Sequence, residues 1–159
     1  SIFLKMNSLT DRQLIDALKE ASQAGVKIKM IIRGICCILP GIEGKTDNIE
    51  VISVVGRFLE HSRIFCFGTG ENMKMYIASA DWMTRNTENR VEIAAPIYDQ
   101  KIKNSIYDTL RIMWKDNLKA RILCSDGTYK KPEIKEGDEL IDCQNYLRHE
   151  YKVGRKIKL

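Results

Sequence analysis

The chain has 159 residues, of which 44% are hydrophobic and 30% charged, and its formal net charge is +5. This length fits a single domain, 1–159, with a buried core, and the composition excludes an intrinsically disordered chain. No apolar run approaches the roughly 18 residues that span a membrane. The mild excess of positive charge favours anionic partners such as nucleotides, nucleic acid or anionic lipid, but an ordinary basic surface explains it equally well.

The five cysteines are Cys36, Cys37, Cys66, Cys124 and Cys143. Their number is odd, three of them lie in apolar runs, and there is no C-x-x-C pair. We therefore expect neither a zinc site nor a disulfide framework. The pattern indicates a reducing cytoplasm and cysteines that serve mostly as small buried hydrophobic residues. Peripheral attachment to the inner face of the membrane stays open.

The first third of the chain predicts a strand, a helix and a second strand, at 1–7, 8–26 and 26–32. Thr10 and Gln13 have the spacing of a capping box at the start of this helix. A helical crossover of this length makes the two strands parallel neighbours, or near neighbours, in one sheet. Because the chain opens in strand-like residues without an initiator methionine, we expect it to be a piece of a longer polypeptide.

The rest of the chain predicts further strands, two helices and connecting loops. A Gly-rich loop follows Arg33. Strands are expected at 49–55, 63–68, 73–79, 89–99 and 119–123, and the residues TGEN form a hairpin turn between the second and third of these. Helices are expected at 99–117, with Asp99 as N-cap, and at 139–152. A polar, turn-rich segment at 125–139 and a basic tail at 153–159 complete the chain. The sum is an α/β domain whose mixed sheet of about six or seven strands is flanked by helices.

Two residues at element boundaries are candidates for chemistry. Arg33 directly follows the strand 26–32, and parallel strands place functional residues at their carboxyl ends; a surface arginine in a loop is the competing interpretation. His61 precedes the strand 63–68, and a histidine there can accept or donate a proton or carry a phosphoryl group, although a lone histidine is more often structural. Arg63 shares the face of His61 if both lie in a strand, and Glu60 could orient the ring or pair with Arg63.

From His61 onward the sequence resembles, in degenerate form, the signature of the phospholipase D superfamily. His61-Ser62-Arg63 stands where that signature has His-x-Lys, and Ala78-Ser79-Ala80-Asp81 replaces Gly-Ser-x-Asn. Glu92 fits the late glutamate, but the aspartate that follows the lysine in the signature is missing. The resemblance implies a phospholipase D-like fold, and phosphodiesterase or nuclease activity is one alternative function.

A closer resemblance covers residues 3–130. The blocks "IIRGICCILPGI", "NIEVISVVGRFLEHSRIFCF" and "YIASADWMTRNTENRVE" are similar in order and spacing to the C-terminal region of the bacterial polyphosphate kinase family. This chain resembles the last domain of those longer chains, the second of two phospholipase D-like domains. Family members extend polyphosphate from ATP through a phosphohistidine in the preceding domain.

The resemblance also implies roles for individual residues. Arg33 and His61 match family residues that line the nucleotide-phosphate site, and Arg90 falls in another basic block near it; Arg63 adds a fourth phosphate-binding candidate. His61 would help the transfer as hydrogen-bond donor or acid, not as the nucleophile. ATP would be the substrate, with Mg²⁺ held by ligands outside this chain, and the full-length enzyme would be a homo-oligomer.

Other interpretations are weaker. A basic nucleic-acid-binding module is disfavoured because aromatic and basic stacking positions do not interleave, so we expect no nucleic-acid partner. His149 lies in the segment least like a motif and predicts a solvated helix face. Ser79 and Asp81 are expected to fix the turn after their strand, and Lys5 and Asn7 are weak candidates for the rim of a site.

Overall fold

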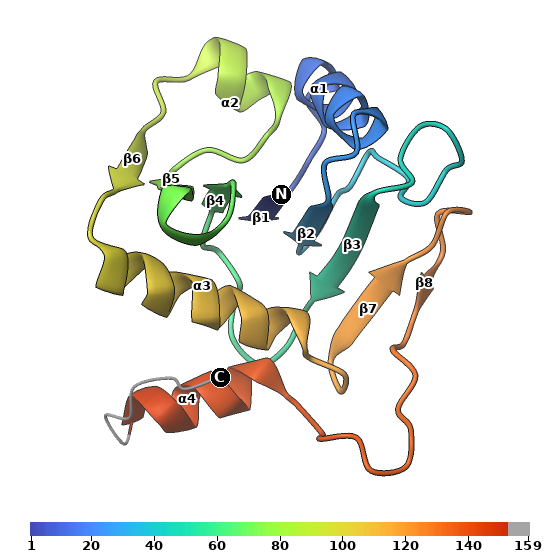
Figure 1. The fold of residues 1–159 in the computed structure, drawn as a ribbon, viewed down its shortest axis with the longest axis vertical. Helices are drawn as coiled ribbons and strands as arrows, with labels where there is room; N and C mark the ends of the chain where they lie inside the picture. The colour runs from blue at the N-terminus through green and yellow to red at the C-terminus, as the bar shows by residue number, and fades with distance from the viewer. Residues whose placement is uncertain (153–159) are drawn as a thin grey trace.

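The computed structural model describes residues 1–152 and contains an eight-stranded mixed β-sheet (Figure 1). The strand order is β6–β5–β4–β1–β2–β3–β7–β8. The strands are β1 (Ile2–Met6), β2 (Ile28–Ile32), β3 (Ile49–Val54), β4 (Ile64–Phe67), β5 (Lys74–Ala78), β6 (Ala94–Ile97), β7 (Ala120–Leu123) and β8 (Tyr129–Lys130). The predicted basic tail at 153–159 lies outside the described residues.

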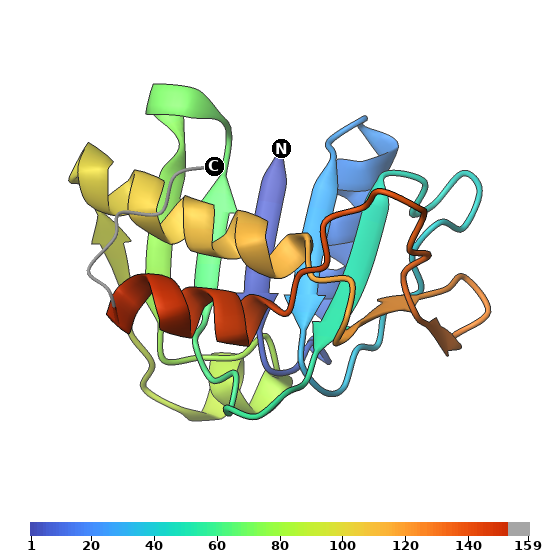
Figure 2. The same ribbon diagram turned by 90° about the horizontal axis from the view of Figure 1, so that it is seen from below.

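Helices cover the two faces of the sheet unequally. Helix α1 (Arg12–Gln23) lies on one face, whereas α3 (Gln100–Trp114) and α4 (Cys143–Lys152) lie on the other (Figure 2). The short helix α2 (Thr84–Asn89) stands beside α1 (Figure 1). The sheet therefore forms the middle of three layers.

Strand β1 shows how the sequence fills both layers. Successive side chains of a strand point to opposite faces. Phe3 therefore packs in the cluster that contains Leu110 and Met113 of α3, whereas Leu4 packs in the cluster that contains Leu18 of α1. A strand with two buried faces reads as a continuous apolar run, as β1 and β2 do.

The predicted β-α-β unit is confirmed, since β1 and β2 are parallel neighbours, with Ile2 opposite Ile28. The predicted hairpin is also confirmed: β4 and β5 pair antiparallel around a short 3-10 helix, Gly70–Asn72. Asp99 caps α3 as expected, accepting the N–H of Ile102 at 2.9 Å.

The predicted capping box of α1 is wrong. Asp11 is the N-cap, and its Oδ1 accepts the N–H of Leu14 at 3.0 Å. The N–H of Thr10 donates to the carbonyl of Trp82 at 2.8 Å. The N–H of Asp11 donates to the same carbonyl at 2.9 Å, so both residues are tied to the neighbouring loop, and it is the Asp11 carboxylate that reaches the helix N-terminus.

Other departures from the predicted elements involve short or polar segments. Helix α2 was not predicted, because the sequence TRNTEN has no apolar stripe; the strand expected at 89–99 is confined to β6. Strand β8 lies in the segment predicted as turns, so the sheet has one strand more than expected. Helix α4 begins four residues later than predicted. The prediction for the cysteines holds for Cys66 and Cys143, which are buried, but Cys37 is exposed.

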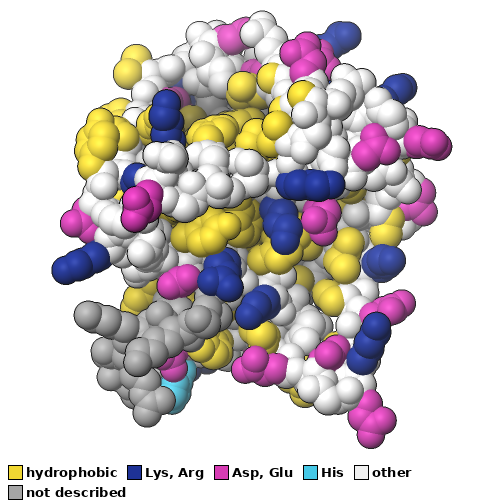
Figure 3. All heavy atoms as spheres, in the orientation of Figure 1, with side chains coloured by type: hydrophobic (Ala, Val, Ile, Leu, Met, Phe, Trp, Pro, Cys, Tyr) yellow, Lys and Arg dark blue, Asp and Glu magenta, His cyan; other side chains and the backbone are white. Residues whose placement is uncertain are grey.

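The surface carries both signs of charge. On the face shown in Figure 3, Lys and Arg side chains are interspersed with Asp and Glu, so the net positive charge is not gathered into one basic patch there. Among the described residues, no helix is long and apolar enough to cross a membrane.

Candidate functional site

The candidate residues gather at one edge of the sheet. Arg33 directly follows β2, at the carboxyl ends of the parallel strands β1 and β2. Strand β4 runs antiparallel to β1, so the residues before β4, His61 and Arg63 among them, enter from the same edge. The loop between β3 and β4 runs along this edge (Figure 2). The fold thus brings Arg33, His61 and Arg63 to one end of the sheet.

Two cationic side chains hold the backbone around His61. Arg33 Nη1 donates to the carbonyl of Glu60 at 3.2 Å, and Lys5 Nζ donates to the carbonyl of Ser62 at 3.2 Å. Each donor comes from the end of a central strand, and each acceptor is a residue next to His61. The position of His61 is therefore tied to the rigid centre of the sheet.

Arg63 contacts the His61 ring directly. Its Nη1 lies 3.2 Å from His61 Nδ1 and also donates to the His61 carbonyl at 3.2 Å. Because a guanidinium can only donate, we assign Nδ1 as the acceptor, which places the proton of the neutral ring on Nε2. The predicted proximity of the two residues is confirmed, but its premise is wrong: β4 begins at Ile64, so both precede the strand.

The predicted partners of Glu60 are also wrong. Its Oε2 lies 3.2 Å from Lys5 Nζ, and its Oε1 accepts from Gln144 Nε2 at 2.7 Å. The Lys5 side chain is only 2% exposed. Burial lowers the pKa of the Lys5 ammonium, and the Glu60 carboxylate opposes that shift. Lys5 therefore lies under the loop as a buried support, not at the rim of a site.

Asp81 is the partner of Arg63. Its two oxygens accept from Arg63 Nε and Nη2 at 3.3 and 3.2 Å and from the backbone and side-chain amides of Asn7 at 2.7 and 3.3 Å. Burial alone would raise the pKa of Asp81, but these hydrogen bonds from Arg63 and Asn7 outweigh it and lower the pKa. The carboxylate holds Arg63 in place against His61 and joins the end of β1 to the turn after β5.

Arg90 lies farther along the same side of the molecule. It is exposed at the end of α2, where the sequence had predicted a strand. Glu92, two residues on, accepts from the Ser79 hydroxyl and from Asn86 Nδ2. The pKa of Glu92 is lowered by these two hydrogen bonds and, more weakly, by the charges of Arg90 and Arg63. Ser79 and Glu92 thus close the segment between β5 and β6.

Three buried polar residues contribute to the site and were not predicted as parts of it. Lys5 and Asn7 were weak candidates for the rim, and Gln144 was not singled out at all. The apolar run of β1 gave a signal for Lys5, since a lysine in an otherwise apolar strand needs a partner. Gln144 gave no such signal, because its contacts lie 84 to 86 residues away in sequence.

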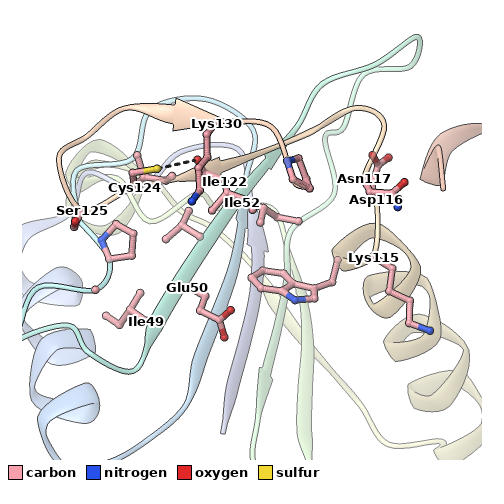
Figure 4. A pocket seen from close by; sticks show the side chains of 16 residues that line it. Ile49, Glu50, Ile52, Lys115, Asp116, Asn117, Ile122, Cys124, Ser125 and Lys130 are labelled. Carbon is pink, nitrogen blue, oxygen red and sulfur yellow. Dashed lines mark hydrogen bonds between the residues drawn. The ribbon is translucent and has the colours of Figure 1, made fainter. Parts of the chain in front are cut away.

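A separate cavity of about 480 Å³ lies elsewhere in the fold (Figure 4). It is lined by β3, β7, β8 and the end of α3, including Glu50, Ile52, Ile122 and Lys130. Arg33, His61, Arg63 and Arg90 are not among its lining residues. At the other edge of the sheet His61 is exposed and Arg33 is half-buried.

The residues at the His61 edge do not form a metal site. The carboxylates there already have partners. Glu60 contacts Lys5 and Gln144, and Asp81 accepts from Arg63. Glu92 accepts from Ser79 and Asn86. Within residues 1–152, no group of three or more His, Cys, Asp and Glu side chains could hold a metal ion.

The sequence profile described as "Polyphosphate kinase C-terminal domain 2" matches residues 1–144. The chain belongs to this family. The polyphosphate kinases of Bacillus anthracis and Vibrio cholerae serotype O1 are 52% and 44% identical to it, over 90% and 99% of this chain but only 20% and 23% of their own length. The chain thus spans about a fifth of the curated relatives that it matches.

Solved structures agree with this assignment. The crystal structure of polyphosphate kinase from Porphyromonas gingivalis matches with a TM-score of 0.90 and 38% identity, covering 96% of this chain and 23% of that one. This match confirms the predicted α/β, phospholipase D-like fold of the polyphosphate kinase domain. NucT from Helicobacter pylori matches with a TM-score of 0.56 at 15% identity, over 72% of this chain and 78% of that chain. At this identity, the second match shows a likeness of fold alone.

Proposed function

We propose that this chain acts as the C-terminal domain of a longer polyphosphate kinase and supplies part of an ATP and polyphosphate site. In this proposal the γ-phosphoryl group of ATP passes reversibly to polyphosphate through a phosphohistidine in another domain. The observation that carries it is the open edge where Arg33 and His61 lie together, fixed through the carbonyls on either side of His61. Membership of the polyphosphate kinase family supports ATP and polyphosphate as the substrates in this proposal.

Arg33 is the proposed phosphate clamp. One of its N–H groups is used to hold the Glu60 carbonyl, which leaves the rest of the planar fork for phosphate oxygens. Transfer of a phosphoryl group depends mainly on positioning and on neutralising spread negative charge. A guanidinium anchored at a strand end supplies both without reorganising during the reaction.

His61 is the proposed helper. With Nδ1 accepting from Arg63, the Nε2–H group is left to donate a hydrogen bond to the reacting phosphate. To act as an acid toward the leaving oxygen, the ring would first have to be protonated at Nδ1 as well and give up that contact with Arg63. The histidine that attacks phosphorus as the nucleophile would have to be another residue. We propose that Arg63, whose charge is largely balanced by Asp81, keeps the ring oriented and adds a hydrogen-bond donor to the phosphate site. Arg90 is proposed to contact the phosphate chain farther along the edge.

Mg²⁺, which this chemistry uses to neutralise nucleotide phosphates, would be held by ligands outside this chain. The phosphohistidine would also lie outside this chain. We also propose a homo-oligomeric full-length enzyme in the cytoplasm. The phosphodiesterase alternative is less well supported, because the arginine in place of its signature lysine is occupied by an aspartate.

Steady-state kinetics of a full-length polyphosphate kinase that carries this segment test the proposal. Arg33→Ala and His61→Ala should each lower the rate of polyphosphate synthesis by about 100-fold or more, as removal of a transition-state donor does. His149→Ala is the matched histidine control, because its side chain is largely exposed on α4. The 159-residue chain alone should extend no polyphosphate.

Wild-type turnover in both site variants would remove the assignment. Sustained ATP-dependent chain extension by the isolated chain would contradict the half-site. If the isolated chain cleaved bis(p-nitrophenyl) phosphate and His61→Ala abolished that cleavage, the phosphodiesterase alternative would replace the proposal.

A further inference from the structure

The side chain of Gln144, which lies far from His61 in sequence, hydrogen-bonds to the loop that carries His61. It is the second residue of α4 and is 7% exposed. Its Oε1 accepts the N–H of Phe58 at 2.9 Å, and its Nε2 donates to the Phe58 carbonyl at 2.8 Å and to Glu60 Oε1 at 2.7 Å. The side-chain amide thus pairs with both backbone groups of one loop residue, as a neighbouring strand would.

Gly56 leaves the space that the Gln144 side chain needs to make these hydrogen bonds. A Cβ atom added at Gly56 would lie 2.5 Å from Gln144 Oε1 and 2.9 Å from its Cδ. Contacts this short do not occur, so a side chain at position 56 would push the amide off Phe58. The φ angle of Gly56 is not positive, so close approach is the reason for glycine here, not backbone conformation.

The start of α4 is anchored independently of Gln144. Asp116, 2% exposed, accepts the N–H of Cys143 at 2.8 Å with one oxygen and the N–H groups of Lys119 and Ala120 at 2.6 and 3.0 Å with the other. This carboxylate joins the first turn of α4 to the turn between α3 and β7. The helix therefore keeps its place when the amide of Gln144 is removed.

Glu60 connects Gln144 to the candidate site. The Glu60 carboxylate lies between Gln144 and Lys5, while its carbonyl accepts from Arg33. We propose that Gln144 is a positioning residue for phosphoryl transfer, setting the loop so that His61 and Arg33 face the same phosphate. Gln144 itself touches no substrate. This inference rests on the proposed function of Arg33 and His61.

A double-mutant cycle in the full-length enzyme tests it. Gln144→Ala should lower kcat/KM for ATP by about 10- to 100-fold, the scale of a misplacement near 1 Å. Asn145→Ala is the matched control, because this amide lies on the same turn of α4 but bonds only to Asp142; it should stay within about twofold of wild type. In a His61→Ala background, Gln144→Ala should cost less than about threefold, since residues in one network couple.

A role in stability alone would lower both backgrounds by the same factor, and that result would overturn the inference. Gly56→Ala gives an independent perturbation of the same contact, with a loss that is less than additive with that of Gln144→Ala. If His61→Ala is impaired but Gln144→Ala and Gly56→Ala are not, only the positioning role fails. If His61→Ala and Arg33→Ala both retain full activity, the proposed function fails, and the positioning role with it.

Gln144→Glu supplies a readout that a structural role would not produce. Its carboxylate would face two acceptors, the Phe58 carbonyl and the Glu60 carboxylate, with Lys5 as the nearest balancing charge. Protonation restores a donor at that position. The activity of this variant relative to wild type should therefore rise as the pH is lowered, and a ratio that stays flat with pH would contradict the proposal.

Discussion

The buried pair beneath the loop gives a stability prediction with a size. Lys5 Nζ and Glu60 Oε2 are 3.2 Å apart, and the two side chains are 2% and 17% exposed. At an effective dielectric constant near 20, two charges at this distance attract by about 5 kcal/mol before desolvation is counted. Lys5→Met removes the cation and leaves the Glu60 carboxylate with Gln144 as its remaining partner. It also leaves the Ser62 carbonyl without its donor. We expect a loss of about 3 kcal/mol, the low end for a broken buried pair.

The partner substitution separates charge from packing. In Lys5→Met with Glu60→Gln, no unpaired charge remains, and only the Ser62 carbonyl lacks a donor, which costs about 1–2 kcal/mol. The double variant should therefore be more stable than Lys5→Met alone. Lys19→Met is the control, because Lys19 pairs with Asp16 at 2.8 Å on the surface, where solvent screening leaves such a pair little effect on stability.

Urea unfolding of the 159-residue chain, followed by circular dichroism, measures these differences at constant m-value. A loss of stability for Lys5→Met no larger than that for Lys19→Met would contradict the buried ion pair. Losses that simply add for the two substitutions at the pair would contradict it too, since interacting residues must couple.

Two further predictions concern carboxylates. The hydrogen bonds of Asp81 lower its pKa below the ordinary 3.8, so its contribution to stability is complete above about pH 5 and is lost as the pH falls below 3.8. The difference in unfolding free energy between wild type and Asp81→Asn should therefore shrink toward low pH; a difference independent of pH would argue against the pairing with Arg63. Asp11→Ala should cost about 1 kcal/mol as an N-cap, whereas Thr10→Ala should cost clearly less, and the reverse order in thermal unfolding would restore the capping box.

The elements that could be predicted are those whose signal is local and repeated. The apolar stripe of α1, the continuous apolar runs of β1 and β2 and the turn of the β4–β5 hairpin each persist over enough residues to define a period. Helix α2 and strand β8 have no such period. Thr87 of α2 is bound to Asp11 at 2.7 Å, so that helix is held by a contact from 76 residues away in sequence.

The candidate site divides in the same way. Arg33 could be predicted because the end of a buried parallel strand is a known location for functional residues. The proximity of His61 and Arg63 follows from their spacing, although they lie in extended chain before the strand. The partners of Glu60 could not be predicted. Arg57 and Arg63 lie close to it in sequence, whereas its partner Lys5 is 55 residues away. The choice is made by burial, since Lys5 is enclosed by the sheet and the loop.

These pairings separate supporting cations from cations available to a ligand. Lys5 is matched by Glu60 and Arg63 by Asp81, so these two positive charges are largely balanced within the fold. Arg33 is bound only through a neutral carbonyl in these contacts, and its full charge therefore stays available at the open edge. Under the proposed function, this makes Arg33 the leading candidate to bind phosphate, although it is half-buried and His61 is more exposed. The proposed function therefore depends more on which basic residues lack a carboxylate partner than on how many basic residues the domain has.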